Sequence, residues 1–118
     1  MSTWMEAGKT GDLAEGTMKG GSIRGRELLL ARVGGQYYAC DNRCSHMGGV
    51  LSKGRLEGTV VTCPRHGSQF DVTSGKVVRW LGEGGLLNAL FKRLKSPRPI
   101  GSYPTRIEGD RIMVELPE

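Results

Sequence analysis

The sequence contains few cysteines and few histidines. It has 118 residues, with three cysteines and two histidines. Three cysteines do not make the disulfide framework of a small secreted domain, so we expect a reducing, cytoplasmic setting. If both histidines bind one metal centre, no histidine remains as the general base of a nucleophile–base pair.

Long apolar runs are also missing. The longest run near the start, residues 28–31, is far too short to span a membrane or to act as a targeting segment. We therefore expect neither a signal peptide nor a membrane anchor. The length fits a single domain over residues 1–118, and 37% hydrophobic residues with 19 glycines favour a loop-rich β protein over a helical bundle.

The residues that carry chemistry lie in two short motifs. These are Cys44-Ser45-His46 and Cys63-Pro64-Arg65-His66, with 16 residues between His46 and Cys63. Each motif supplies one thiolate and one imidazole, and two of each can bind a 2Fe–2S cluster, with the thiolates on one iron and the imidazoles on the other. Zinc also accepts two Cys and two His. Structural zinc sites, however, usually pair two nearby cysteines with a later histidine pair, so the mixed motifs favour iron–sulfur over zinc or no metal.

The two motifs and their flanking residues, 41–49 and 63–71, resemble the Rieske iron–sulfur family, and the resemblance extends from about Asp12 to Val114. It implies an all-β Rieske fold of antiparallel sheets with two cluster-binding loops. It also implies one 2Fe–2S cluster bound by Cys44, His46, Cys63 and His66. The respiratory branch of the family has an extra cysteine in each motif, and these form a disulfide. Gly49 and Arg65 stand at the matching positions here, which indicates the oxygenase-ferredoxin-like branch without that disulfide.

The same resemblance assigns supporting roles around the cluster. Gly48 would let the backbone approach the cluster, and Pro64 would shape the second loop. Ser68 stands where high-potential relatives have a serine that donates to a bridging sulfide, whereas Phe70 replaces a tyrosine that donates to a cysteine sulfur. Losing one donor predicts a potential in the lower part of the Rieske range. Cys40, outside both motifs, is interpreted as a small buried apolar residue.

The function expected from these residues is a soluble one-electron carrier that passes electrons from a reductase to an oxygenase or a similar acceptor. The chain itself is not expected to be an enzyme. A Rieske oxygenase subunit also needs a mononuclear iron bound by two histidines and a carboxylate, and no histidine is left for it. Two alternatives remain, a small Rieske subunit of a larger redox enzyme of the nitrite reductase kind and a membrane-associated electron-transfer protein.

Short strand-like segments, closely spaced and separated by turn residues, predict an antiparallel all-β architecture. We expect strands at 27–33 and 36–40 around the turn Gly34-Gly35, at 58–62, and at 70–72 and 76–78. A terminal hairpin is expected from 103–107 and 111–116. Residues 1–22 are polar and glycine-rich and carry no strand prediction, with a short turn expected at 12–16.

One segment departs from this pattern and is expected to be a short helical insertion near 84–96. Its apolar residues, at 86, 87, 90, 91 and 94, recur with helical periodicity.

Residues 76–98 carry six basic residues and one acidic residue, whereas the rest of the chain has eleven of each. Lys92, Arg93 and Lys95 are therefore candidates for docking an acidic redox partner or, as an alternative, an anionic membrane. The simpler alternative is a helix on the sheet with a solvated basic face. Nucleic acid is not expected, because no aromatic stacking surface accompanies the basic residues.

Overall fold

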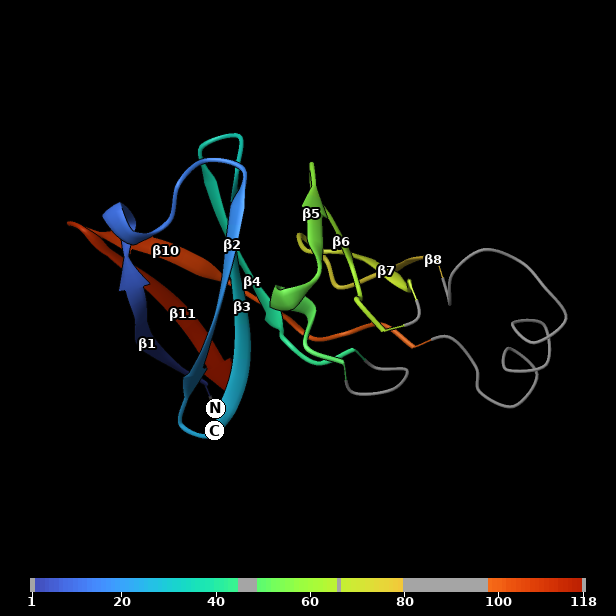
Figure 1. Ribbon diagram of the computed structural model, residues 1–118. Coiled ribbons are helices and arrows are strands. Elements are labelled where there is room, and N and C mark those ends of the chain that lie inside the picture. The colour runs from blue at the N-terminus through green and yellow to red at the C-terminus, as the bar shows by residue number, and fades with distance from the viewer. Residues whose placement is uncertain (1, 45–48, 66, 80–97, 118) are drawn as a thin grey trace, which may run out of the picture.

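A computed structural model of the chain describes residues 2–44, 49–65, 67–79 and 98–117, and these form three antiparallel sheets (Figure 1). The terminal sheet has the order β1-β11-β10, the central sheet β2-β3-β4-β9, and the small sheet β5-β6-β7-β8. The strands are β1 (Ser2–Lys9), β2 (Thr17–Ile23), β3 (Arg26–Val33), β4 (Gln36–Asp41), β5 (Arg55–Glu57), β6 (Val60–Thr62), β7 (Gln69–Asp71), β8 (Val77–Arg79), β9 (Ser102–Tyr103), β10 (Thr105–Glu108) and β11 (Arg111–Pro117). Two short 3-10 helices, η1 (Thr10–Asp12) and η2 (Leu51–Lys53), complete the described elements.

The central sheet lies between the other two sheets (Figure 1). β3 contributes residues to a core on each of its faces. Successive side chains of a strand point to opposite faces. Leu28 and Leu30 accordingly pack with Ile112 and Val114 of the terminal sheet. Leu29 and Ala31 pack with residues of the small sheet and both loops. The apolar run at 28–31 is therefore a strand that is buried on both faces.

The predicted hairpin at 27–40 is confirmed. β3 and β4 pair from Leu28↔Asp41 to Val33↔Gln36 around a two-residue turn. Gly34 and Gly35 both have positive φ, 62° and 76°, which is the conformation that the favoured two-residue hairpin turns require. The Glu15 carboxylate accepts hydrogen bonds from the amides of Gly34 and Gly35, at 2.6 and 2.8 Å. These bonds lower the pKa of Glu15 and tie the turn at 12–16 to this hairpin.

The structure differs from the sequence predictions at both ends of the chain. Residues 1–22, which carried no strand prediction, contain β1 and all but the last residue of β2. β1 pairs with β11 from Ser2↔Pro117 to Lys9↔Arg111, so the pairing partner lies about one hundred residues away in sequence. The single strand expected at 103–107 is two strands, because Pro104 separates β9, which pairs with β4, from β10, which pairs with β11.

The smaller predicted strands are shifted or incomplete. β5 carried no prediction, and the strand expected at 58–62 begins only at Val60 because Gly58, with φ 59°, belongs to the turn after β5. The strands expected at 70–72 and 76–78 are β7 and β8, each displaced by one residue. The helix expected near 84–96 lies outside the described residues. Within the residues described, the chain forms no helix that is long and apolar enough to cross a membrane.

Candidate functional site

The first motif loop leaves the end of β4 and closes like a hairpin. Arg43 and Val50 form an isolated antiparallel bridge, and the Cys44 amide donates to the Gly49 carbonyl at 2.8 Å. These contacts bring the chain on the two sides of residues 45–48 together. His46 and Gly48 themselves lie outside the described residues.

The second motif loop connects β6 to β7 and is tighter. The Cys63 amide donates to the Ser68 carbonyl at 2.8 Å, and the Gly67 amide donates to the Cys63 carbonyl at 3.1 Å. Gly67 has φ 78°, a conformation that a side chain would strain. Pro64 is exposed in the turn, and His66 lies outside the described residues.

The two loops contact each other at Gly49. A Cβ atom at this position would lie 2.8 Å from Cys63 Sγ and 3.2 Å from Arg65 Cγ. The backbone of the first loop therefore packs directly against a sulfur of the second motif and against the stem of Arg65. These are the positions where the respiratory branch has its disulfide cysteines, and here a close packing contact joins them.

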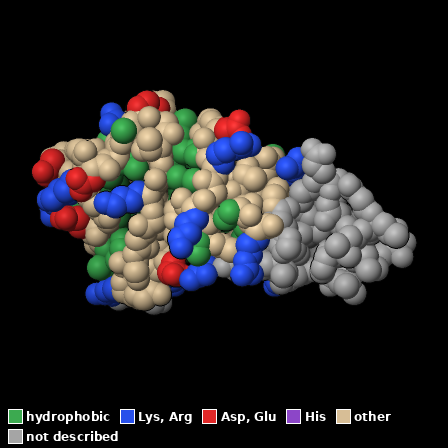
Figure 2. All heavy atoms as spheres, viewed as in Figure 1, with side chains coloured by type: hydrophobic (Ala, Val, Ile, Leu, Met, Phe, Trp, Pro, Cys, Tyr) green, Lys and Arg blue, Asp and Glu red, His purple; other side chains and the backbone are tan. Residues whose placement is uncertain are grey.

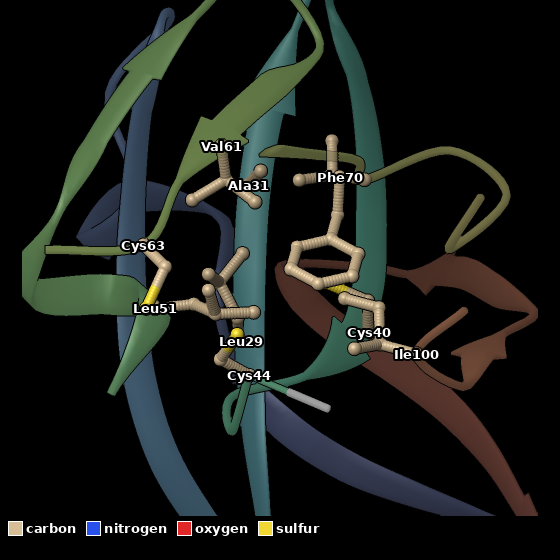
Figure 3. Packing of buried hydrophobic residues seen from close by; sticks show 10 residues of the cluster. Leu29, Ala31, Cys40, Cys44, Leu51, Val61, Cys63, Phe70 and Ile100 are labelled. Atoms are coloured by element: carbon tan, nitrogen blue, oxygen red, sulfur yellow. The ribbon is translucent and has the colours of Figure 1, made fainter. Parts of the chain in front are cut away.

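The two motif cysteines are buried in one apolar cluster. Cys44 is 4% exposed and Cys63 is 2% exposed, and neither forms a disulfide. Figure 3 shows Cys44 beside Leu29 and Cys63 beside Leu51, within the core that the small sheet shares with the central sheet. Two buried soft donors at the starts of two touching loops suit a metal or iron–sulfur group. They fit the expected 2Fe–2S cluster, with one sulfur contributed by each loop.

Cys40 differs from this pair in position and chemistry. It lies on β4, fully buried beside Phe70 and Ile100 (Figure 3). Burial, with a smaller contribution from the charge of Asp41, raises the pKa of its thiol to about 12. A thiol with that pKa stays protonated at neutral pH, so Cys40 is a packing residue, as predicted.

An ion pair supports the start of the first loop. Both Nε and Nη2 of Arg43 donate to the carboxylate of Glu27 on β3, the latter at 3.0 Å. The hydrogen bond from Arg43 holds the pKa of Glu27 below its usual value. One residue earlier, the buried Asn42 donates its amide to the Glu27 carbonyl at 3.0 Å and accepts a bond from the Ser52 amide at 2.7 Å. The base of the loop is thus joined to both β3 and η2.

A second polar anchor joins the end of β4 to β9. The Asp41 carboxylate accepts hydrogen bonds from the Gly101 amide at 2.7 Å and from the Tyr103 hydroxyl at 2.5 Å. Partial burial, with the hydrogen bond to Asp41, raises the pKa of Tyr103 to about 12. Sequence reasoning found neither this anchor nor the Glu27–Arg43 pair, because each joins residues that lie far apart in the sequence.

The remaining predicted site residues are only partly described. Ser68 and Phe70 are both fully buried, and Phe70 belongs to the same apolar cluster as the two motif cysteines. Gly48, His46 and His66 lie outside the described residues, as do the docking candidates Lys92, Arg93 and Lys95. In the part of the chain that the structure describes, no group of three His, Cys, Asp or Glu side chains gathers around one point.

Comparisons with known proteins place this arrangement in a family. Residues 3–88 match the family model of the Rieske [2Fe-2S] domain. The ferredoxin component of the naphthalene 1,2-dioxygenase system of Pseudomonas putida is 36% identical over 113 residues, which cover 96% of this chain and 95% of that protein. The ferredoxin component of biphenyl 2,3-dioxygenase of Rhodococcus jostii (strain RHA1) is 33% identical, with 91% and 87% covered.

Solved structures share the fold over nearly the whole chain. A ferredoxin of Sphingomonas yanoikuyae B1 superposes with a TM-score of 0.78 at 22% identity, covering 98% of this chain and all of that one (100%). A chain in the complex of reduced oxygenase and oxidized ferredoxin in carbazole 1,9a-dioxygenase superposes with a TM-score of 0.74 at 28% identity, covering 94% and 91%. The predicted antiparallel all-β architecture is therefore confirmed.

Proposed function

The chain belongs to the Rieske [2Fe-2S] domain family, and we propose that it is the ferredoxin component of an oxygenase system, carrying single electrons from a reductase to a terminal oxygenase. It binds one 2Fe–2S cluster. The observation that carries the proposal is the similarity to ferredoxin components of dioxygenase systems over almost their entire length. A solved complex of such a ferredoxin with its oxygenase supports the same direction of electron flow. These relatives are carriers within multi-component systems, and this chain is likewise a carrier rather than the catalytic component.

We propose Cys44, His46, Cys63 and His66 as the cluster ligands. Support comes from the two cysteines, which are buried outside any disulfide and are brought together by loops in contact at Gly49. The cluster, when bound, supplies reversible one-electron transfer. The protein's own contribution is to orient the thiolates, through the amide hydrogen bonds of Cys44 and Cys63, and to exclude water with Leu29, Leu51 and the rest of the apolar cluster.

Neighbouring residues are proposed to tune this site. Ser68 and Phe70 both lie in the buried layer beside the second loop. A Phe at position 70 supplies no hydroxyl donor to a cysteine sulfur, which favours a lower reduction potential than that of relatives with a donor there. Gly48 and Pro64 complete the proposed loop residues. We further propose a cytoplasmic location, where a reducing environment keeps the ligand thiols available.

The experiment compares two buried cysteines that differ in their proposed role. Cys63→Ala should abolish or badly impair cluster assembly, whereas Cys40→Ala should keep two irons and two sulfides per chain and cost only stability. Iron and acid-labile sulfide analysis with EPR of the reduced protein measures the difference. The carrier function is tested by stopped-flow oxidation of the reduced protein on mixing with a dioxygenase terminal component. Full iron content in Cys63→Ala would refute the ligand assignment, and a loaded protein that no oxygenase oxidises would refute the carrier role.

A further inference from the structure

Positive charge is concentrated on the part of the molecule that holds the two motif loops. Residues 43–79, which comprise both loops, η2 and the small sheet, contain six basic and two acidic residues. The terminal and central sheets, in residues 1–42 and 99–118, contain seven basic and nine acidic residues. The equal numbers of basic and acidic residues outside 76–98 therefore hide an uneven distribution. Residues 43–75 have an excess of basic residues, and residues 1–42 with 99–118 have an excess of acidic ones. In Figure 2, viewed as in Figure 1, the acidic side chains in view gather mainly over the terminal sheet, whereas Lys and Arg predominate over the small sheet.

Strand register places two of these basic residues on one row across the small sheet. Arg55 pairs with Thr62, Thr62 with Gln69, and Gln69 with Arg79. Directly opposed residues of antiparallel strands point to the same face. The Gln69 side chain donates to the Thr62 hydroxyl at 3.1 Å, so the two central members of the row are joined.

This row faces solvent. The next row along the same strands, Leu56, Val61, Phe70 and Val77, packs into the core, so the row from Arg55 to Arg79 points the other way. The Arg55 side chain is 78% exposed, and Arg79 is exposed as well. Beside Arg79, at an irregularity in the register of β8, the apolar Val78 is 52% exposed.

The row also borders the second motif loop. Thr62 directly precedes Cys63, and Gln69 directly follows Ser68. Arg65, exposed within that loop, has its stem against Gly49 and adds a positive charge to the loop that borders the row. A partner that touches this row would therefore lie next to the loop that carries Cys63.

We propose that this basic face, defined as Arg55, Thr62, Arg65, Gln69, Val78 and Arg79, docks an acidic surface of the protein that accepts the electron. The inference rests on the proposed carrier function and adds the partner's chemistry and the residues that recognise it. Complementary charge speeds encounter more than it tightens the final complex, which suits a carrier that must also leave quickly. Glu57 lies 3.1 Å from Arg55 and offsets part of its charge, which moderates the attraction.

The test compares two double charge reversals that change the net charge equally. Arg55→Glu/Arg79→Glu alters the basic face, and Lys19→Glu/Arg24→Glu alters exposed residues of the central sheet and its turn. Iron and sulfide content and the absorption spectrum should match wild type in both. With a terminal oxygenase that oxidises the wild-type protein, the basic-face variant should be oxidised about tenfold more slowly at low ionic strength. The difference should shrink as salt is added, and the control pair should change the rate far less.

A single substitution that makes the basic face more positive tests the same inference by a faster rather than a slower oxidation. Glu57→Gln removes the negative charge beside Arg55 and should increase the rate of oxidation severalfold at low ionic strength. Equal slowing by both double variants would overturn the inference in favour of net charge alone. An unchanged rate in Arg55→Glu/Arg79→Glu, or slowing only of its reduction by the reductase, would also overturn it. In each of these cases the wild-type protein still transfers electrons, so the carrier function stands; failure of the wild-type protein itself would instead refute that function.

Discussion

At the scale of single residues, the contact between the two motif loops depends on the small size of Gly49. Its amino acid has no side chain, and the space that a Cβ would need is occupied by Cys63 Sγ and the stem of Arg65. The contact is between a backbone and a proposed ligand atom, so neither partner can move far without shifting the site. Arg65 adds apolar contact through its stem while its charge remains in solvent.

Gly49→Ala should therefore lower stability and disturb cluster loading together. The added methyl would lie 2.8 Å from Cys63 Sγ, and overpacking of this kind costs about 1–3 kcal/mol of unfolding free energy. Thermal unfolding and iron content measure the two effects. Gly21→Ala is the matched control, because a Cβ at Gly21 meets no atom within 4 Å and its φ is not positive. Normal loading and stability in Gly49→Ala would show that the loops adjust freely.

At the scale of elements, strands are stabilised by contacts from outside their own sheet. The small sheet consists of four strands of three residues each. It depends on η2 and on the core that it shares with the central sheet. The β3–β4 hairpin, which leads to the first loop, is likewise secured by a carboxylate from the turn before β2. Glu15 binds both turn amides and lies 3.8 Å from Arg32 Nε.

Replacement of Glu15 tests this support through its pH dependence. The pKa of Glu15 is lowered in the folded protein, chiefly by the amides of Gly35 and Gly34. Its contribution to stability is therefore present above the unfolded value of about 4.5 and is lost as pH falls through the lower folded value. Glu15→Gln should melt at a lower temperature than wild type at pH 7, and the difference should shrink in acid. Thermal melts at several pH values measure this, and a difference that is constant with pH would contradict the role of the charge.

At the scale of the whole molecule, charge is divided between a basic part that carries the loops and an acidic remainder. The expected insertion near 84–96 contains three further basic residues, Lys92, Arg93 and Lys95. Long-range fields of this kind steer acidic partners and are screened by salt. The docking role of these three residues and the single-domain organisation of residues 1–118 remain predictions.

Reversing the charges of Lys92, Arg93 and Lys95 should show whether this segment steers an acidic partner or serves only as a packed helix. Lys92→Glu/Arg93→Glu/Lys95→Glu should leave the absorption and EPR spectra unchanged and slow electron transfer severalfold at low ionic strength, with recovery at high salt. Stopped-flow transfer to the acceptor measures the effect. Leu87→Asp and Leu90→Asp test the alternative, since they should cost stability if the segment is a helix packed on the sheet. An unchanged rate in the triple variant, together with unstable Leu variants, would favour a purely structural helix.

The amino-acid sequence by itself was sufficient for the local features and for the chemical character of the site. Cys44 and Cys63 were predicted as ligands from their residue types and spacing, which do not depend on how the chain packs. The turn Gly34-Gly35 was predicted because positive φ at two successive residues is a local property of glycine. β3, β4 and β11 were found because clear turn residues mark their ends.

Only the tertiary structure decided which distant residues meet. β1 was not predicted because its partner β11 follows it by about one hundred residues, and pairing rather than local preference makes it a strand. The contact of Gly49 with Cys63, the anchor from Asp41 to Tyr103 and the row from Arg55 to Arg79 all depend on strand register and loop packing. Register is a relation between segments and cannot be read from charge counts along the sequence. Those counts placed the excess of basic residues at 76–98, whereas in the folded chain basic residues also predominate across the small sheet and both loops.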